Sequence, residues 1–271
     1  MKNVFISSDI EGVAGICNWD EANEAHPEYK QFQNLMTGEV KAICDTLDGA
    51  AEKIVVRDAH ATARNLIHSQ FPPKVELIRS FNGHPHCMMF GLDDTFDGSI
   101  LHGYHPAGFK NSSPLAHTLT RRRINKIKIN GEIIGEVTIS IYTSIMRGAP
   151  VFYVVGDRGA VEEAQNLNEN IVGTITKEGF GASVRSFNPK FVNSKIQEDL
   201  KHAVQKFDEN KEKFLIKLPE KFYVEVEYLD QTDAYRKSFY PGAKLLDAKT
   251  ICFETTDYND VLTMFCFCIM A

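Results

Sequence analysis

The 271-residue sequence lacks a long apolar run. A helix that crosses a bilayer needs roughly 18 or more mostly apolar residues. The nearest candidate is the segment VLTMFCFCIMA, which is too short, follows Asp257 and Asp260, and is interpreted as a buried terminal helix. The first residues, MKNVFISSD, enter an apolar run without the charged region, long apolar stretch and cleavage site of a secretory leader. We therefore expect a cytoplasmic protein that does not bind a membrane.

Cysteine pairs and basic clusters are also scarce. Of the six cysteines, only Cys266 and Cys268 lie close together, and a single residue separates them. This spacing differs from the C-x-x-C of zinc and redox sites, so we expect reduced, buried thiols. The formal net charge is -6, and the one basic run is Arg121-Arg122-Arg123, interpreted as a solvated turn or an interface. These features argue against a nucleic-acid partner.

The first half of the chain alternates between apolar runs rich in β-branched residues and longer amphipathic segments. This pattern is typical of βαβ units and predicts a mostly parallel sheet with flanking helices. The expected strands cover residues 3–7, 53–57, 75–79 and 99–103, and a long crossover helix is expected over residues 29–51.

The second half has a different texture. Residues 124–134 alternate on both sides of Asn130-Gly131, which predicts a β-hairpin. Helices are expected over residues 135–146, 158–167 and 189–211, and strands over 150–156, 222–228 and 250–255. The fold class predicted is therefore α/β, with a mostly parallel sheet, a β-hairpin insertion and a C-terminal α+β elaboration. We place a loose boundary between an α/β metal-binding core, residues 1–190, and a C-terminal part, residues 191–271.

Metal-ligating residues follow three of the expected strands. Asp9 and Glu11 follow the first strand, His60 the second and His105 the fourth. Loops that leave the carboxyl edge of an open α/β sheet converge on one crevice. Neighbouring carboxylates repel each other, and a cation relieves that repulsion. Taken alone, Asp9 and Glu11 could instead cap a helix, but carboxylates combined with imidazoles favour zinc or a similar metal over calcium.

Seven of the nine histidines fall between residues 60 and 117, and we do not expect all of them to bind metal. His68, His84 and His86 have polar loop context and are expected to be solvated. His102 lies within a strand and alternates with Gly103, so both cannot face the crevice, whereas His105 lies at the strand exit.

The segments SSDIEGVAG, VVRDAHATARNL, GLDDTFDGSILHGYHP, LAHT and NGEIIGE, in this order, resemble the metal-dependent D-aminopeptidases of the DppA type, peptidase family M55. The resemblance is close over the first 150 residues and loose beyond them. It implies a zinc-dependent enzyme that hydrolyses the N-terminal residue of short peptides containing D-amino acids.

The resemblance also implies roles for individual residues. Asp9, Glu11, His60, His105 and Glu136 correspond to the ligands of a dinuclear zinc centre, with two Zn²⁺ per subunit and Asp9 as the bridging ligand. His117, in Ala-His-Thr, corresponds to the catalytic histidine. Five ligands exceed what one tetrahedral catalytic zinc with an open position uses, whereas two metals use them all. Family members form homo-oligomers, and a decamer of two pentameric rings is expected.

The sequence departs from the family pattern after Glu136. It has Val137-Thr138-Ile139-Ser140 in place of a Gly-Leu-Asn-Ala step, Asp157-Arg158-Gly159 in place of a more acidic triplet, and Gly181 in place of an arginine. The expected metal ligands are intact, so these changes concern contacts with the substrate.

Three other functions fit parts of the pattern. A metal-dependent amidase that acts on peptidoglycan fragments or other D-residue amides would keep the same chemistry. A dinuclear-metal phosphoesterase would use similar ligands, but the sequence has no Gly-rich phosphate loop. A structural metal site would need no catalytic histidine, and the presence of His117 argues against it.

Overall fold

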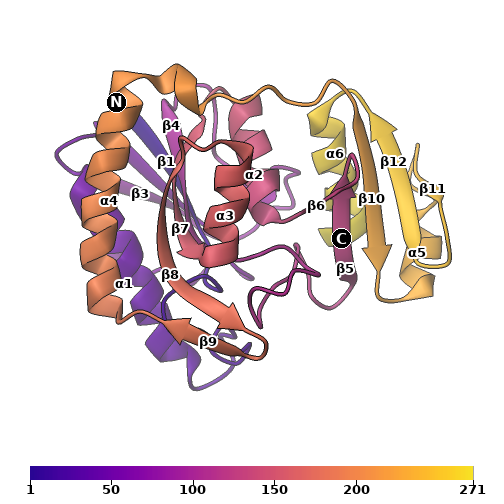
Figure 1. Cartoon of the computed structure of the whole chain (residues 1–271), viewed down its shortest axis with the longest axis horizontal. Coiled ribbons are helices and arrows are strands. Elements are labelled where there is room, and N and C mark those ends of the chain that lie inside the picture. Colours follow the sequence, from indigo (N-terminus) through magenta and orange to yellow (C-terminus); the bar gives the residue numbers. More distant parts are fainter. Residues whose placement is uncertain (271) are drawn as a thin grey trace.

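Two β-sheets of different kinds organise the chain in the computed structural model, which describes residues 1–270 (Figure 1). The first sheet has the strand order β3-β2-β1-β4-β7-β8-β9, and neighbouring strands are parallel except β9, which runs antiparallel to β8. Its strands are β1 (Asn3–Ser8), β2 (Lys53–Asp58), β3 (Val75–Ile78), β4 (Gly98–Tyr104), β7 (Val151–Asp157), β8 (Val172–Phe180) and β9 (Ser183–Ser186).

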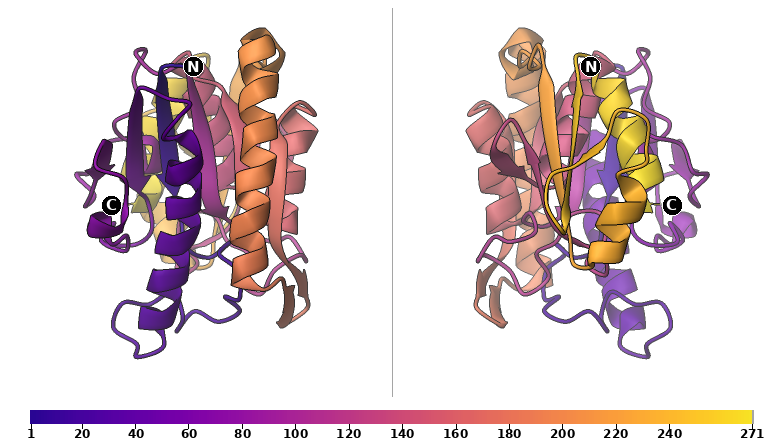
Figure 2. Two further views of the ribbon diagram at one scale, coloured as in Figure 1. Left: turned by 90° about the vertical axis from the view of Figure 1, so that its left-hand side faces the viewer. Right: turned by 90° about the vertical axis from the view of Figure 1, so that its right-hand side faces the viewer.

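Helices cover both faces of this sheet. Helices α1 (Tyr29–Leu47) and α4 (Pro189–Glu209) lie side by side on one face, as the left view of Figure 2 shows. Helices α2 (Glu136–Met146) and α3 (Arg158–Leu167) cover the other face. Helix α1 buries Phe32, Met36, Val40 and Ile43 along one stripe, because these residues recur at helical spacing.

The second sheet is antiparallel and packs on the outer side of α2. Its strand order is β11-β12-β10-β5-β6. The strands are β5 (Ile124–Ile129), β6 (Glu132–Ile134), β10 (Phe222–Tyr228), β11 (Lys244–Leu245) and β12 (Thr250–Thr255). Helix α6 (Tyr258–Phe265) and Ile139 of α2 contribute to the core beneath this sheet, and α5 (Gln231–Lys237) flanks it (Figures 1 and 2).

The hairpin turn explains how the second sheet begins. Asn130 and Gly131 have φ values of 52° and 89°, as a type I′ turn requires. The hairpin is confirmed, and β5 pairs with β10, almost 100 residues further along the chain, as Ile129 opposes Val224.

Helix α4, most of which follows residue 190, packs on the first sheet. The α/β fold class is confirmed, and a boundary near residue 190 stays a prediction.

The C-terminal segment differs from the expectation of a buried helix. Helix α6 ends at Phe265, and residues Cys266–Met270 form a π-helical turn in which Phe267 is 57% exposed. Ala271, the last residue of the expected helix, lies outside the described residues. No helix within residues 1–270 is long and apolar enough to cross a membrane.

A close backbone approach joins the ends of β1 and β4. The amide of Gly12 donates to the carbonyl of Gly103 at 2.7 Å. A Cβ on Gly12 would lie 2.0 Å from the carbonyl oxygen of Tyr104, and one on Gly103 would lie 2.1 Å from that of Asp9. Both positions therefore require glycine, and Gly103 also has φ of +69°. The two loops that follow β1 and β4 are held against each other.

Candidate metal centre

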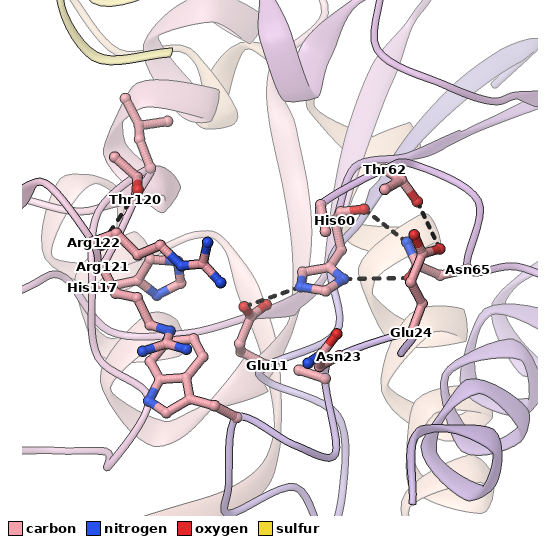
Figure 3. Close-up of a pocket in the computed structure, with 14 residues that line it drawn as sticks. Glu11, Asn23, Glu24, His60, Thr62, Asn65, His117, Thr120, Arg121 and Arg122 are labelled. Carbon is pink, nitrogen blue, oxygen red and sulfur yellow. Dashed lines mark hydrogen bonds and ion pairs between the residues drawn. The ribbon is translucent and has the colours of Figure 1, made fainter. Parts of the chain in front are cut away.

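The six residues singled out from the sequence meet at the carboxyl edge of the first sheet. Strands β2, β1 and β4 are neighbours, so the loops that follow them converge on one place. Glu136 is the first residue of α2, and His117 lies in the loop between β4 and β5. The cluster is formed by Asp9, Glu11, His60, His105, His117 and Glu136, and Figure 3 shows Glu11, His60 and His117 around the smaller of two adjoining cavities.

Short distances connect these side chains. Nε2 of His60 lies 3.3 Å from Oε1 of Glu11. Nε2 of His105 lies 3.6 Å from Oδ2 of Asp9 and 3.5 Å from Oε1 of Glu136. Asp9, Glu11 and Glu136 are at most 4% exposed, and His105 is fully buried. Ionisable groups are seldom buried in such numbers unless they are paired or bind a cation.

Hydrogen bonds fix which ring nitrogen faces the cluster. Nδ1 of His105 donates to the carbonyl of Pro106 at 3.0 Å, so Nε2 is the nitrogen that faces Asp9 and Glu136. Nδ1 of His60 donates to Oδ1 of Asn65 at 3.3 Å, which leaves Nε2 free to face Glu11. An outer hydrogen bond of this kind is the usual support of a metal-binding histidine.

The charges of the cluster are strongly coupled. Burial raises the pKa of Asp9 well above its usual value, and the carboxylates of Glu11 and Glu136 add to this effect. Burial also acts to raise the pKa of Glu11, but the neighbouring His60 and the more distant His117 and His105 outweigh it and hold that pKa well below its usual value. A cation would relieve the repulsion among the three carboxylates.

The donor set fits zinc. Within residues 1–270, the buried atoms Oε2 of Glu11 and Nε2 of His105 have no hydrogen-bond partner. Two groups of three residues each have ligand atoms that all lie within 4.8 Å of one another. One group is Asp9, Glu11 and His105, and the other is His105, His117 and Glu136. Carboxylate oxygens and imidazole nitrogens at such spacing suit zinc. The two groups share His105.

His117 is held firmly at the edge of the cluster. Its ring stacks on that of His105 with 4.1 Å between centroids, and the edge of Trp19 packs against it. Nδ1 donates to the carbonyl of Leu115 at 3.0 Å, and Nε2 lies 3.7 Å from Oε1 of Glu136. Burial and the neighbouring His105 lower the pKa of His117, which keeps the ring neutral near pH 7.

The other histidines of the dense region lie outside the cluster. His102 is fully buried, and its Nε2 lies 3.0 Å from Oε2 of Glu39. His84 lines the larger cavity described below, and His68 and His86 contact Val75 and Asn259. The sequence-based separation of His102 from His105 is confirmed.

Several supporting residues were missed by the sequence analysis. Asn65 holds His60 and donates to Oδ1 of Asp58 at 2.7 Å. Lys177 is fully buried, lies 3.3 Å from Asp157 and donates to the carbonyls of Glu11 and Val13. For Asn65 the sequence offered one signal, an Asn five residues after His60. For Lys177 it offered none, because the partners of Lys177 become its neighbours only in the folded sheet.

Two cavities adjoin the cluster. One has a volume of about 310 Å³ and polar walls that include Asn23, Glu24 and Thr62. The other has a volume of about 680 Å³ and apolar walls that include Phe81, Met88 and Phe267. Residues that line both are Glu11, His60, Ala61, His117, Leu119, Thr120 and Arg122. A substrate could therefore extend to either side of the cluster.

The fold and this cluster define an α/β protein with a candidate metal centre of the kind that hydrolases use. The family model Peptidase_M55, described as D-aminopeptidase, matches residues 1–267, and the chain belongs to this family of peptide-bond hydrolases. The resemblance stated from the sequence is confirmed, and neither the amidase nor the phosphoesterase alternative is favoured.

Individual relatives agree with the family. The chain is 25% identical over 268 residues to a D-aminopeptidase of Bacillus subtilis strain 168, and the match covers 96% of each chain. It is also similar to the solved structure of the Zn-dependent D-aminopeptidase DppA from Bacillus subtilis, described as a self-compartmentalizing protease. That match has a TM-score of 0.90 and 23% identity, and covers 99% of this chain and 97% of the other. The structural similarity shows a shared fold.

Proposed function

We propose that this protein is a zinc-dependent D-aminopeptidase that removes the N-terminal residue from short peptides containing D-amino acids. The observation that most supports the proposal is the buried cluster of carboxylates and imidazoles, in which Oε2 of Glu11 and Nε2 of His105 have no hydrogen-bond partner within residues 1–270. Membership of the D-aminopeptidase family and the zinc dependence of the Bacillus relative add support.

The proposed ligands are Asp9, Glu11, His60, His105 and Glu136, which would hold two Zn²⁺ per subunit with Asp9 between them. Two overlapping groups of candidate ligands, which contain every proposed ligand except His60 and also include His117, support room for more than one ion. Zinc at this place would polarise the scissile carbonyl and lower the pKa of the attacking water. Asp9, with its raised pKa, would become ionised when a cation binds beside it.

His117 is proposed to move a proton during hydrolysis. Its Nδ1 proton is committed to Leu115, so Nε2 is the atom that accepts or returns a proton. The lowered pKa leaves Nε2 unprotonated near pH 7, and stacking on His105 keeps the ring in position. In the metal-free protein Glu136 raises the pKa of His105 to about 9 against the opposing effect of burial, and a bound cation would displace that proton from Nε2.

The proposed function is tested by the release of free amino acid from D-Ala-D-Ala and from L-Ala-L-Ala by zinc-loaded protein, with a chelator-treated sample as control. We expect chelator-sensitive cleavage of the D-peptide and little or none of the L-peptide. Equal cleavage of both peptides would contradict the stereochemistry, and cleavage that survives removal of zinc would contradict the role of the metal.

A homo-oligomer is also proposed, with ten subunits in two stacked pentameric rings. The self-compartmentalizing description of the Bacillus relative supports association of this chain with copies of itself. Large apolar side chains on the surface, such as Phe239 at 71% and Phe109 at 65% exposure, would become covered on assembly. Light scattering of the purified protein gives the mass, and a monomer at micromolar concentration would contradict the proposal.

A cytoplasmic location is proposed on the basis of cysteine chemistry. All six cysteines are free thiols, but only Cys44, Cys252 and Cys268 are buried as expected, whereas Cys87 and Cys266 are half-buried and Cys17 is exposed. Free thiols of this number suit a reducing compartment. Fractionation of cells that express the protein would test this location.

A further inference from the structure

Arg122 lies beside the metal centre, in the loop that also provides His117. It lines both cavities, and Figure 3 shows its guanidinium extending into the space opposite Glu11 and His60. The Arg122 backbone amide donates to Oγ1 of Thr120 at 3.4 Å, which helps to fix the start of the side chain. Within residues 1–270, the Arg122 guanidinium has no hydrogen bond or ion pair.

Nearby arginines are engaged in contacts of their own. The guanidinium of Arg121 lies 4.3 Å from the ring centroid of Trp19, and that of Arg64 lies 3.1 Å from Oε1 of Glu24. These two arginines stabilise the wall of the polar cavity. Arg122 differs because its charge faces the shared space between the two cavities.

The surroundings of Arg122 explain which group it would attract. Asp9, Glu11 and Glu136 suit a cation, and their own negative charge prevents these three side chains from binding the carboxylate of a substrate. A short peptide has an amine at one end and a carboxylate at the other. When the scissile carbonyl of a dipeptide lies at the centre, its carboxylate is one residue away, because consecutive Cα atoms are about 3.8 Å apart. A guanidinium binds a carboxylate through two parallel hydrogen bonds.

We propose that Arg122 binds the free α-carboxylate of the peptide substrate and so makes the site selective for dipeptides with an unmodified C-terminus. This inference rests on the proposed function and specifies its substrate class. A longer peptide places its carboxylate further from the centre, and an amidated dipeptide has no negative charge to offer. Both lose the contact with Arg122.

The test compares D-Ala-D-Ala with its C-terminal amide in the zinc-loaded wild type and in Arg122→Gln, Arg122→Lys and Arg236→Gln. Arg236 is an exposed residue of helix α5, which flanks the second sheet, and serves as the matched control. We expect Arg122→Gln to lower kcat/KM for the free acid about 10- to 100-fold, mainly through KM, and to leave the amide nearly unchanged. Arg122→Lys should be intermediate, because it keeps the charge but loses the two-pronged contact.

Binding provides a readout that does not depend on turnover. Calorimetry compares the binding of D-Ala-D-Ala to two zinc-loaded proteins, His117→Ala and the double variant His117→Ala with Arg122→Gln. The double variant should bind about 10- to 100-fold more weakly. An equal effect of Arg122→Gln on acid and amide, or no effect on either, would overturn the assignment of Arg122 while leaving the D-aminopeptidase activity in place. If the wild type cleaves neither peptide, the proposed function fails, and calorimetry still decides whether Arg122 binds a carboxylate.

Discussion

Oε1 of Glu163, in α3, accepts a hydrogen bond from the backbone amide of Gly135 at 2.8 Å, one residue before Glu136. The same oxygen accepts from Oγ1 of Thr138 at 2.6 Å and from its amide at 3.2 Å. Glu163 therefore caps the N-terminus of α2, although it belongs to a different helix. The cap fixes the first turn of α2, and with it the carboxylate of Glu136.

Replacing Glu163 with alanine should destabilise the protein by about 1–3 kcal/mol, because buried donors of Gly135 and Thr138 lose their acceptor. Glu163→Gln should cost much less, because its amide oxygen can still accept. Denaturant unfolding gives the stability, and zinc titration should show weaker binding in the alanine variant. Equal stability of the two variants would show that the cap does not depend on this oxygen.

The buried pair of Lys177 and Asp157 supports the loop that contains Glu11. Burial raises the pKa of Asp157, and the side chains of both residues are fully buried. Lys177→Met should destabilise the protein by about 3–5 kcal/mol, because it leaves an unpaired buried carboxyl. Combining it with Asp157→Leu should recover part of that loss. Purely additive unfolding free energies in this double-mutant cycle would contradict a coupled pair.

The close approach of β1 and β4 at Gly12 leaves no room for a side chain. Gly12→Ala should cost at least about 1–3 kcal/mol and should weaken zinc binding, because the loops of Asp9 and His105 must separate. Gly49 is the matched control, since no atom lies within 4 Å of its added Cβ. Thermal unfolding and zinc titration of both variants test this, and a Gly12→Ala protein that behaves like Gly49→Ala would contradict the argument.

Asp97 connects the start of β1 with the start of β4 and should make stability depend on pH. Burial acts to raise its pKa, but the amides of Asn3, at 2.9 Å, and Lys2 outweigh burial and lower the pKa below the usual 3.8. A lowered folded-state pKa gives stability that is present above the unfolded pKa and is lost as pH falls through the folded one.

Asp97→Asn should therefore be less stable than the wild type by up to about 1 kcal/mol near pH 7. The difference should shrink as the pH falls below about 4. Unfolding is measured on chelator-treated samples of both proteins, so that loss of metal in acid does not contribute. A difference that is constant with pH would show that ionisation of Asp97 is not its cause.

Four of the five proposed ligands could be singled out from the sequence because each follows a strand with a clear apolar pattern. Asp9, Glu11, His60 and His105 leave strands that the topology places side by side, and the family motifs identify Glu136 and His117. The predicted strands and helices of this region agree with the structure, although α1 ends at Leu47 rather than at residue 51.

Residues that support the ligands were harder to predict. Strand β8 was missed, because its sequence VGTITKEGF has no continuous apolar run. Lys177 is opposite Asp157 only through the pairing of β7 and β8. Strands β5, β6, β10 and β12 of the second sheet were predicted, and the short β11 was not. The pairing of β5 with β10 joins distant segments, and no local pattern specifies such a partner.

The central claim is that three strand ends and α2 assemble a zinc centre, with His117 as a proton-transfer group beside it. The most direct measurement is the zinc content of the wild type, Asp9→Ala and His117→Ala, taken together with D-Ala-D-Ala hydrolysis by the same samples. We predict two zinc ions per chain in the wild type and in His117→Ala, with hydrolysis reduced about 10²- to 10⁴-fold in the latter, and loss of both zinc and activity in Asp9→Ala. Loss of zinc from His117→Ala to the same extent as from Asp9→Ala would contradict the account, because His117 would then be a ligand.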